Sequence, residues 1–144
     1  MEQNVRIWVW VMVINKEWKI LMGKRKSLLW EWKYWPPGWH QDFGESIEET
    51  VIRELKEESN LDANLSDIIY YGFTDDYMPQ ENKHYISMRF ILKRYSGEMK
   101  NMEPQKLEEW KWMGWDEIKN LWDKIFLPIQ NFIKKYPDFD PCKL

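Results

Sequence analysis

The sequence predicts an α/β fold in which helices cover both faces of a central sheet. Its 144 residues match the commonest size of a single domain, so we expect one domain over 1–144. β-rich runs and amphipathic helical segments alternate along the chain. The first run is apolar on both faces, which is typical of a central strand. Its two faces are Val5, Ile7, Val9, Val11 and Val13 on one side, and Arg6, Trp8, Trp10, Met12 and Ile14 on the other.

The elements follow one another with short connections. The strands at 5–14 and 18–25 are expected to form a hairpin across Asn15, Lys16 and Glu17. The remaining predicted elements are a helix at 47–59, strands at 67–77, 84–95 and 107–115, and helices at 116–124 and 128–136. The last helix opens on Pro128, a good first-turn residue.

The helix at 47–59 has its own start and stop signals. Ser46 followed by Glu49 is the pattern of a capping box, and the acidic residues of the first turn suit the helix dipole. Asn60 is expected to end the helix in the left-handed conformation, where Asn is the next best residue after Gly.

Three acidic residues of this helix predict its chemistry. Glu54, Glu57 and Glu58 stand at i, i+3 and i+4, so they share one face, and each like-charged pair costs about 0.2–0.5 kcal/mol. A divalent cation would remove that conflict, and ligands that offer only oxygen suit Mg²⁺ or Mn²⁺. Mg²⁺ is usually bound together with substrate phosphates, so the face indicates phosphate chemistry. The alternative is a solvated acidic face without a ligand.

The segment 38–61, GWHQDFGESIEETVIRELKEESNL, resembles the Nudix box, G-x5-E-x7-R-E-U-x-E-E-x-G-U with U aliphatic. Every charged position and both aliphatic positions match in register, at Glu45, Arg53, Glu54, Leu55, Glu57, Glu58 and Leu61. The two glycine positions hold Trp39 and Asn60 instead, although Gly38 precedes the first of them. An indole where the family has glycine can narrow a cleft or displace a loop.

The resemblance implies a Nudix α/β/α sandwich with a mixed central sheet. It also implies metal-dependent hydrolysis of the pyrophosphate linkage in a nucleoside triphosphate or a related nucleoside diphosphate derivative, as in the MutT-like branch. The segment 101–112 is similar to one in nucleotide triphosphate pyrophosphatases of this family, which favours a free nucleotide.

The resemblance also assigns roles. The metal ligands would be Glu54, Glu57, Glu58 and the carbonyl of Gly38, and the catalytic residues Glu54, Arg53 and Glu57. Arg53 is expected to orient carboxylates by pairing with Glu49 and Glu57, with Glu45 as a further candidate. Glu54 is the first choice for the general base, and the alternatives are Glu103, Glu108 and Glu109.

Tryptophan is unusually frequent and glycine unusually rare. The chain has 11 Trp and 6 Gly, where about ten Gly are average for this length. This composition indicates an engineered or strongly diverged sequence. Trp8, Trp10 and Trp39, joined by Trp30, Trp32 and Trp35, would fill or line the cleft where a base stacks, or would be ordinary core or interface residues. For Trp110, Trp112, Trp115 and Trp122 we favour a core or interface role.

Three polar residues complete the predicted substrate-binding set. Lys24 and Arg25 end the second strand and are candidates to meet phosphates, with a plain surface role as the alternative. His40 is a candidate nucleotide contact; it and His84 lack metal-ligand spacing, so ordinary hydrogen bonding is the alternative reading.

Composition and charge restrict the partners. With 21 basic and 24 acidic residues the net charge is −3 and no basic stripe is visible, so long nucleic acid is not expected. The longest apolar run, 7–14, is too short for a bilayer, and the start lacks the features of a signal peptide, so we expect a cytoplasmic protein without a membrane partner. Cys142 alone cannot form an internal disulfide. A homodimer is a further expectation, because exposed aromatic residues often mark interfaces.

Two functions of different classes follow. The first is a metal-dependent nucleotide pyrophosphatase. The second is an engineered or catalytically impaired Nudix scaffold, whose Trp-lined cleft or surface binds an aromatic ligand or serves self-assembly.

Overall fold

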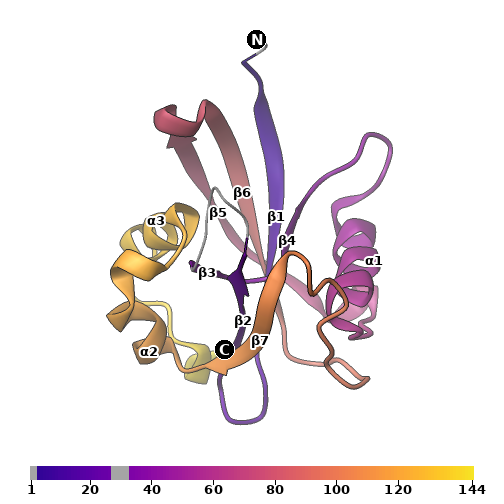
Figure 1. Cartoon of the computed structure of the whole chain (residues 1–144). Helices are drawn as coiled ribbons and strands as arrows, with labels where there is room; N and C mark the ends of the chain where they lie inside the picture. The colour runs from indigo at the N-terminus through magenta and orange to yellow at the C-terminus, as the bar shows by residue number, and fades with distance from the viewer. Residues whose placement is uncertain (1–2, 27–32) are drawn as a thin grey trace.

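The structure, a computed structural model, describes residues 3–26 and 33–144 (Figure 1). Its strands are β1 (Val5–Val13), β2 (Ile20–Arg25), β3 (Tyr34–Trp35), β4 (Gly38–His40), β5 (Ile68–Met78), β6 (Lys83–Leu92) and β7 (Leu107–Met113). Its α-helices are α1 (Ile47–Ser59), α2 (Trp115–Asn120) and α3 (Leu127–Lys135). Short 3₁₀ turns lie at Leu65–Asp67, Pro79–Glu81, Trp122–Lys124 and Pro141–Lys143.

The strands form two sheets between the helices. In the four-stranded sheet the order is β4-β1-β6-β5, and β1 runs parallel to β6 but antiparallel to β4. In the three-stranded sheet β2 lies between β3 and β7, antiparallel to both. Figure 1 shows α1 on one side of the sheets and α2 with α3 on the other. The predicted α/β/α sandwich with a mixed sheet is therefore confirmed.

The predicted hairpin between the first two strands is wrong. β1 and β2 belong to different sheets and meet only at the bridge between Ile14 and Ile20. Both edges of β1 are already paired, with β4 and β6, so β2 pairs elsewhere. Trp18 stands in the turn at a φ of 63°, and β2 begins at Ile20 rather than at Trp18.

Smaller differences concern the ends of elements. β7 stops at Met113, and the predicted helix at 116–124 is α2 followed by a separate 3₁₀ turn at Trp122–Lys124. β3 and β4 were not predicted, because runs of two and three residues carry no periodicity. In the described part of the chain no helix is long and apolar enough to cross a membrane.

The two faces of β1 pack into two separate cores, as its alternation predicts. Val9, Val11 and Val13 pack against Val51 and Leu55 of α1. The opposite face packs on the side of α2 and α3, through Trp8, Trp10, Met12 and Ile14 against residues that include Ile118, Phe126 and Phe132. The acidic helix and the indoles of β1 thus lie on opposite sides of the four-stranded sheet.

Candidate active site

The helix α1 is held at both ends by the predicted caps. The hydroxyl of Ser46 accepts a hydrogen bond from the backbone N–H of Glu49 at 3.2 Å. Asn60 ends the helix with a φ of 66°, and its side-chain amide donates to the carbonyl of Glu98 at 2.9 Å. The caps fix where α1 begins and ends, and the packing of its apolar residues Val51 and Leu55 on β1 sets the direction in which its glutamates point.

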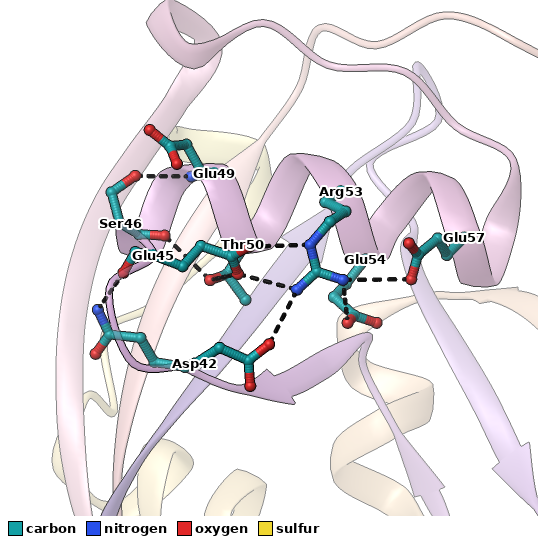
Figure 2. Close-up of polar contacts among 9 residues, drawn as sticks. Asp42, Glu45, Ser46, Glu49, Thr50, Arg53, Glu54 and Glu57 are labelled. Atoms are coloured by element: carbon teal, nitrogen blue, oxygen red, sulfur yellow. Dashed lines mark hydrogen bonds and ion pairs between the residues drawn. The ribbon is translucent and has the colours of Figure 1, made fainter.

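Arg53 gathers the carboxylates in the middle of α1 (Figure 2). Its Nε and Nη2 donate to the two carboxylate oxygens of Glu45 at 3.0 and 2.9 Å, a bidentate pair. Its Nη1 donates to Glu54 at 2.7 Å and to Glu57 at 3.4 Å, and Asp42 lies 3.4 Å from Nη2. The whole guanidinium is therefore committed to carboxylates.

The expected partners of Arg53 are confirmed for Glu45 and Glu57 and wrong for Glu49. In Figure 2 Glu49 lies beside Ser46, away from the guanidinium. The described ion pairs of Arg53 do not include Glu49. The Nε, Nη1 and Nη2 of Arg53 already donate to other carboxylates, so no N–H of the guanidinium is left for Glu49.

These bonds perturb the ionisation of the group. Hydrogen bonds from Arg53 and Thr50 lower the pKa of Glu45, and those to Glu45 and Glu54 raise the pKa of Arg53. Burial raises the pKa of Glu54, although Arg53 acts in the opposite direction. Glu54 is thus a partly buried carboxylate with one fixed cationic neighbour.

The carboxyl end of α1 is tied to the loop that precedes β7. Its last carbonyls lack helical partners and take donors from this loop instead. The carbonyl of Glu58 accepts from the backbone N–H of Met102 and from the indole of Trp110, both at 3.2 Å. The carbonyl of Ser59 accepts from the N–H of Lys100 at 2.9 Å. These bonds bring the side chain of Glu103 to Glu58.

Glu58 lies among other carboxylates, and its charge also interacts with that of Arg25. Burial raises its pKa to about 8, and Glu103 and Glu54 contribute through charge repulsion. The indole N–H of Trp39 lies near enough to lower the pKa of Glu58 somewhat, yet it makes no hydrogen bond of regular geometry. Glu103 is paired with Lys106 at 3.0 Å, whereas the described ion pairs include none to Glu58.

A small cleft opens beside these two glutamates. It has a volume of about 30 Å³. Its lining consists of Trp10, Arg25, Trp35, Pro36, Pro37, Gly38, Glu58, Glu103, Lys106, Leu107 and Trp110. Gly38 and Arg25, predicted from the sequence, therefore do meet Glu58 here.

Arg25 is the basic residue of the cleft. Its guanidinium lies 3.8 Å from the ring centroid of Trp35, a cation–π arrangement, and its Nε has no hydrogen-bond partner. Burial lowers its pKa, while Glu58 and Glu103 act in the opposite direction. Lys24 does not line the cleft and pairs instead with Glu108 at 3.7 Å, so the two predicted phosphate contacts are separated.

The predicted aromatic contacts are divided between the two sides of the sheet. Trp10 lines the cleft, and Trp8 stacks behind it at 4.6 Å between ring centroids. Trp39 packs in the core under α1, so its expected place in the cleft is wrong: opposite Val9 in the β4–β1 pairing, its side chain points to the α1 face. Trp30 and Trp32 lie outside the described residues.

His40 does not line the cleft that holds Glu58 and Glu103. Its ring stacks on Tyr85 at 5.3 Å and lies 5.2 Å from Trp8. Burial lowers its pKa, with Arg6 and Lys83 adding to the effect. Its surroundings are those of a neutral aromatic contact.

The donors near Glu58 fit a hard divalent cation. Glu54, Glu58 and Glu103 interact electrostatically, and Glu57 adjoins Glu54. Among the described residues no three acidic, His or Cys side chains already converge closely enough to hold a metal ion. The chemistry of the donors therefore matches Mg²⁺ or Mn²⁺, whereas their present spacing requires side-chain rotation to bind one.

Sequence reasoning missed part of this lining. Trp110 was expected to be core or interface, but its indole holds the carbonyl of Glu58 and its ring lines the cleft. Glu103 was named only as a candidate base. The sole signal for both was the likeness of segment 101–112 to nucleotide triphosphate pyrophosphatases.

The architecture is thus an α/β/α sandwich in which Glu58, at the end of the acidic helix α1, lies beside Glu103. The family model of the NUDIX domain matches residues 5–132 of this chain. The chain is 35% identical over 124 residues to an ADP-ribose pyrophosphatase from Methanocaldococcus jannaschii, which covers 86% of this chain and 69% of that protein. It is 27% identical over 154 residues to an RNA pyrophosphohydrolase from Wolbachia pipientis subsp. Culex pipiens, and this match covers 92% of this chain and 94% of that protein.

Solved structures agree on the fold. The MutT protein from Methanosarcina mazei Go1 superposes with a TM-score of 0.77 at 19% identity, over 95% of this chain and 96% of that one. The chain belongs to the Nudix family of hydrolases. Nudix hydrolases generally use divalent metal ions and bind nucleotide substrates.

Proposed function

We propose that the protein hydrolyses the pyrophosphate linkage of a nucleoside triphosphate or a related nucleoside diphosphate derivative, with Mg²⁺ or Mn²⁺. The observation that carries this proposal is the meeting of Glu58 with Glu103 and Glu54 beside a cleft that also holds Arg25. Two relatives named for pyrophosphate chemistry, one on ADP-ribose and one on RNA, support the same reaction class.

The metal would be held by Glu54, Glu57 and Glu58 with the carbonyl of Gly38, and Glu103 is the additional ligand that the cleft offers. When bound, the ion supplies neutralisation of the pyrophosphate charge and a more acidic water. Arg25 lines the cleft, and we propose that its guanidinium binds a phosphate oxygen there.

The same residues account for proton transfer from the water and for departure of the leaving group. Water attacks one phosphorus, its proton passes to a carboxylate, and the bridging oxygen leaves with the other phosphate. We assign Glu54 as the base. Arg53 positions it, since their 2.7 Å bond fixes the direction of the carboxylate. Glu103 is the competing candidate because it lines the cleft, whereas Glu108 pairs with Lys24 and neither it nor Glu109 lines the cleft.

The test is an assay with Mg²⁺ and a panel of nucleoside triphosphates, ADP-ribose and an RNA with a 5′ triphosphate, following release of pyrophosphate or phosphate. We expect turnover of at least one compound and its loss in a Glu57→Gln, Glu58→Gln double variant. A wild-type rate equal to that of the double variant would exclude the proposal.

A second candidate function rests on the aromatic residues. Trp8, Trp10 and Trp35 pack together with Phe126 next to the cleft, which supports an engineered or catalytically impaired scaffold that binds an aromatic ligand. Tryptophan fluorescence that responds to an apolar aromatic compound but not to nucleotides would favour this function over the first.

The wider setting completes the proposal. We propose one Nudix domain over 1–144, acting in the cytoplasm, without long nucleic acid or membrane as an obligatory partner. A homodimer is supported by the exposed aromatic residues of β5, which include Tyr70, Phe73 and Tyr77.

A further inference from the structure

Four aromatic side chains form a continuous cluster behind the cleft. This aromatic cluster consists of Trp8, Trp10, Trp35 and Phe126. Their ring centroids lie 4.6 Å apart for Trp8 and Trp10, 5.9 Å for Trp10 and Trp35, and 4.8 Å for Trp35 and Phe126. All four are buried, Trp10 and Phe126 completely. The four rings therefore pack against one another behind the cleft.

Trp10 connects the aromatic cluster to the carboxylate site and is closely packed on both sides. It lines the cleft together with Glu58, and it packs directly on the backbone of β4. A Cβ added at Gly38 would lie 2.6 Å from Cε3 of Trp10. On its other flank the guanidinium of Arg89 lies 5.2 Å from the Trp10 ring. The indole cannot swing aside without displacing β4 or a buried arginine.

The free space beside the glutamates is correspondingly small. At about 30 Å³ the cleft has room for a few ordered waters or phosphate oxygens. Pockets that enclose an organic ligand have volumes of roughly 300–1,000 Å³. Among the described residues, the walls around Glu58 thus admit a phosphate group and leave no enclosed place for a base.

The indole N–H groups indicate that the side chains of the cluster matter for their volume and not for hydrogen bonding. The Nε1 atoms of Trp8 and Trp10 are buried and have no hydrogen-bond partner. A buried donor without an acceptor is unfavourable, so polar contacts do not explain why indoles stand here. What the two indoles supply is volume.

From these observations we infer that the aromatic cluster excludes the nucleobase from the fold, so that the site recognises the pyrophosphate group and is indifferent to the base. The inference rests on the proposed pyrophosphatase function. It names the substrate class as polyphosphate esters whose organic groups stay outside the cleft.

The test compares substrates with different bases and with none. We expect kcat/KM for ATP, GTP, CTP and UTP to agree within about threefold, below the roughly tenfold that even one methylene can give in a fitted pocket. Calorimetry with methylene-bridged analogues of ATP and GTP and with methylenediphosphonate gives a readout independent of turnover. We expect their affinities to agree within the same range.

Variants of the cluster provide the second arm. Replacing Trp8 and Trp10 together by Leu should open a space and create a preference among bases of about tenfold or more. Trp10→Phe keeps an aromatic ring but removes the unpaired donor and part of the indole volume, so it should change the ratios among bases far less than the double Leu variant. Circular dichroism checks that each variant is folded.

The outcomes separate the two claims. A wild-type preference above about tenfold for one base, in turnover or in analogue binding, overturns the inference and leaves the pyrophosphatase standing. No turnover and no binding of any compound by the folded wild type overturns the proposed function, and the inference with it.

Discussion

The glutamates in the middle of α1 and the glutamate at its carboxyl end have different surroundings. In the middle, Arg53 binds Glu45, Glu54 and Glu57 together, and the protein itself supplies the positive charge. At the end, Glu58 is half-buried beside Glu103, and no described ion pair reaches it. The two groups are only one helical turn apart.

The difference shows which carboxylates shape the site and which still need a cation. Each carboxylate around Arg53 is bonded to its guanidinium, so this one cation can hold the loop of Glu45 and the side chain of Glu54 in place without a ligand. Glu58 has no ion pair among the described residues, although Lys106 pairs with Glu103 and Arg25 lines the same cleft. The raised pKa of Glu58 means that without a metal it keeps a proton at neutral pH. We therefore propose that Glu58 is the ligand whose ionisation depends on the metal, whereas Arg53 holds the other two proposed ligands, Glu54 and Glu57, in position.

The largest effect is expected from Glu58→Gln. An amide keeps the size of the side chain but is a weak ligand for a hard cation, so activity should fall by more than about 100-fold, beyond what outer-shell changes usually cause. Glu48→Gln, an exposed change in the first turn of the same helix, is the matched control and should leave the rate unchanged. Initial rates at saturating Mg²⁺ measure both. A Glu58→Gln enzyme with half of the wild-type rate would refute the assignment.

Arg53→Lys should have a smaller effect, spread over stability and activity. Lysine cannot make the bidentate bond to Glu45 and also reach Glu54, so the base loses its orientation. We expect activity to fall by about 10- to 100-fold and the thermal midpoint to drop.

The two variants are expected to differ in the metal concentration that gives half-maximal activity, the KM for the metal. It should change little in Arg53→Lys, but strongly in Glu58→Gln. If Arg53→Lys instead abolished metal activation while keeping its thermal midpoint, the division between the two groups would be wrong.

Ser46→Ala should affect stability alone. Losing the bond from the Glu49 N–H to the Ser46 hydroxyl is expected to cost about 1 kcal/mol in the free energy of unfolding. Urea denaturation measures this loss. Because the cap is at the opposite end of α1 from Glu58, the activity of the folded enzyme should remain that of the wild type, and a change of tenfold would show that the two ends are coupled.

The sequence predicted the fold and the acidic helix well, because both depend on local signals. The alternation of β1, the Ser46 cap and the left-handed Asn60 are each visible in a few consecutive residues, and the structure confirms them. The partner of Glu58 was not visible in this way. Glu103 reaches it only because backbone donors of the loop before β7 satisfy the last carbonyls of α1.

Long-range pairing explains the remaining errors too. The β1–β2 hairpin fails because β4 and β6, distant in sequence, occupy both edges of β1. Trp39 was expected in the cleft because of its place in the Nudix box. Its register opposite Val9 turns it to the α1 face instead.

Titration of the metal-free protein with Mn²⁺ by calorimetry, in buffers of different ionisation enthalpy, tests the assignment most directly. Because the metal needs the carboxylate and the pKa of Glu58 is about 8, binding at pH 7 should release close to one proton, and affinity should rise with pH until about 8 and then level off. Glu58→Gln should bind weakly and release none. Tight Mn²⁺ binding that releases no proton at pH 7, or that is unchanged in Glu58→Gln, would contradict the assignment of Glu58 as the ligand whose ionisation depends on the metal.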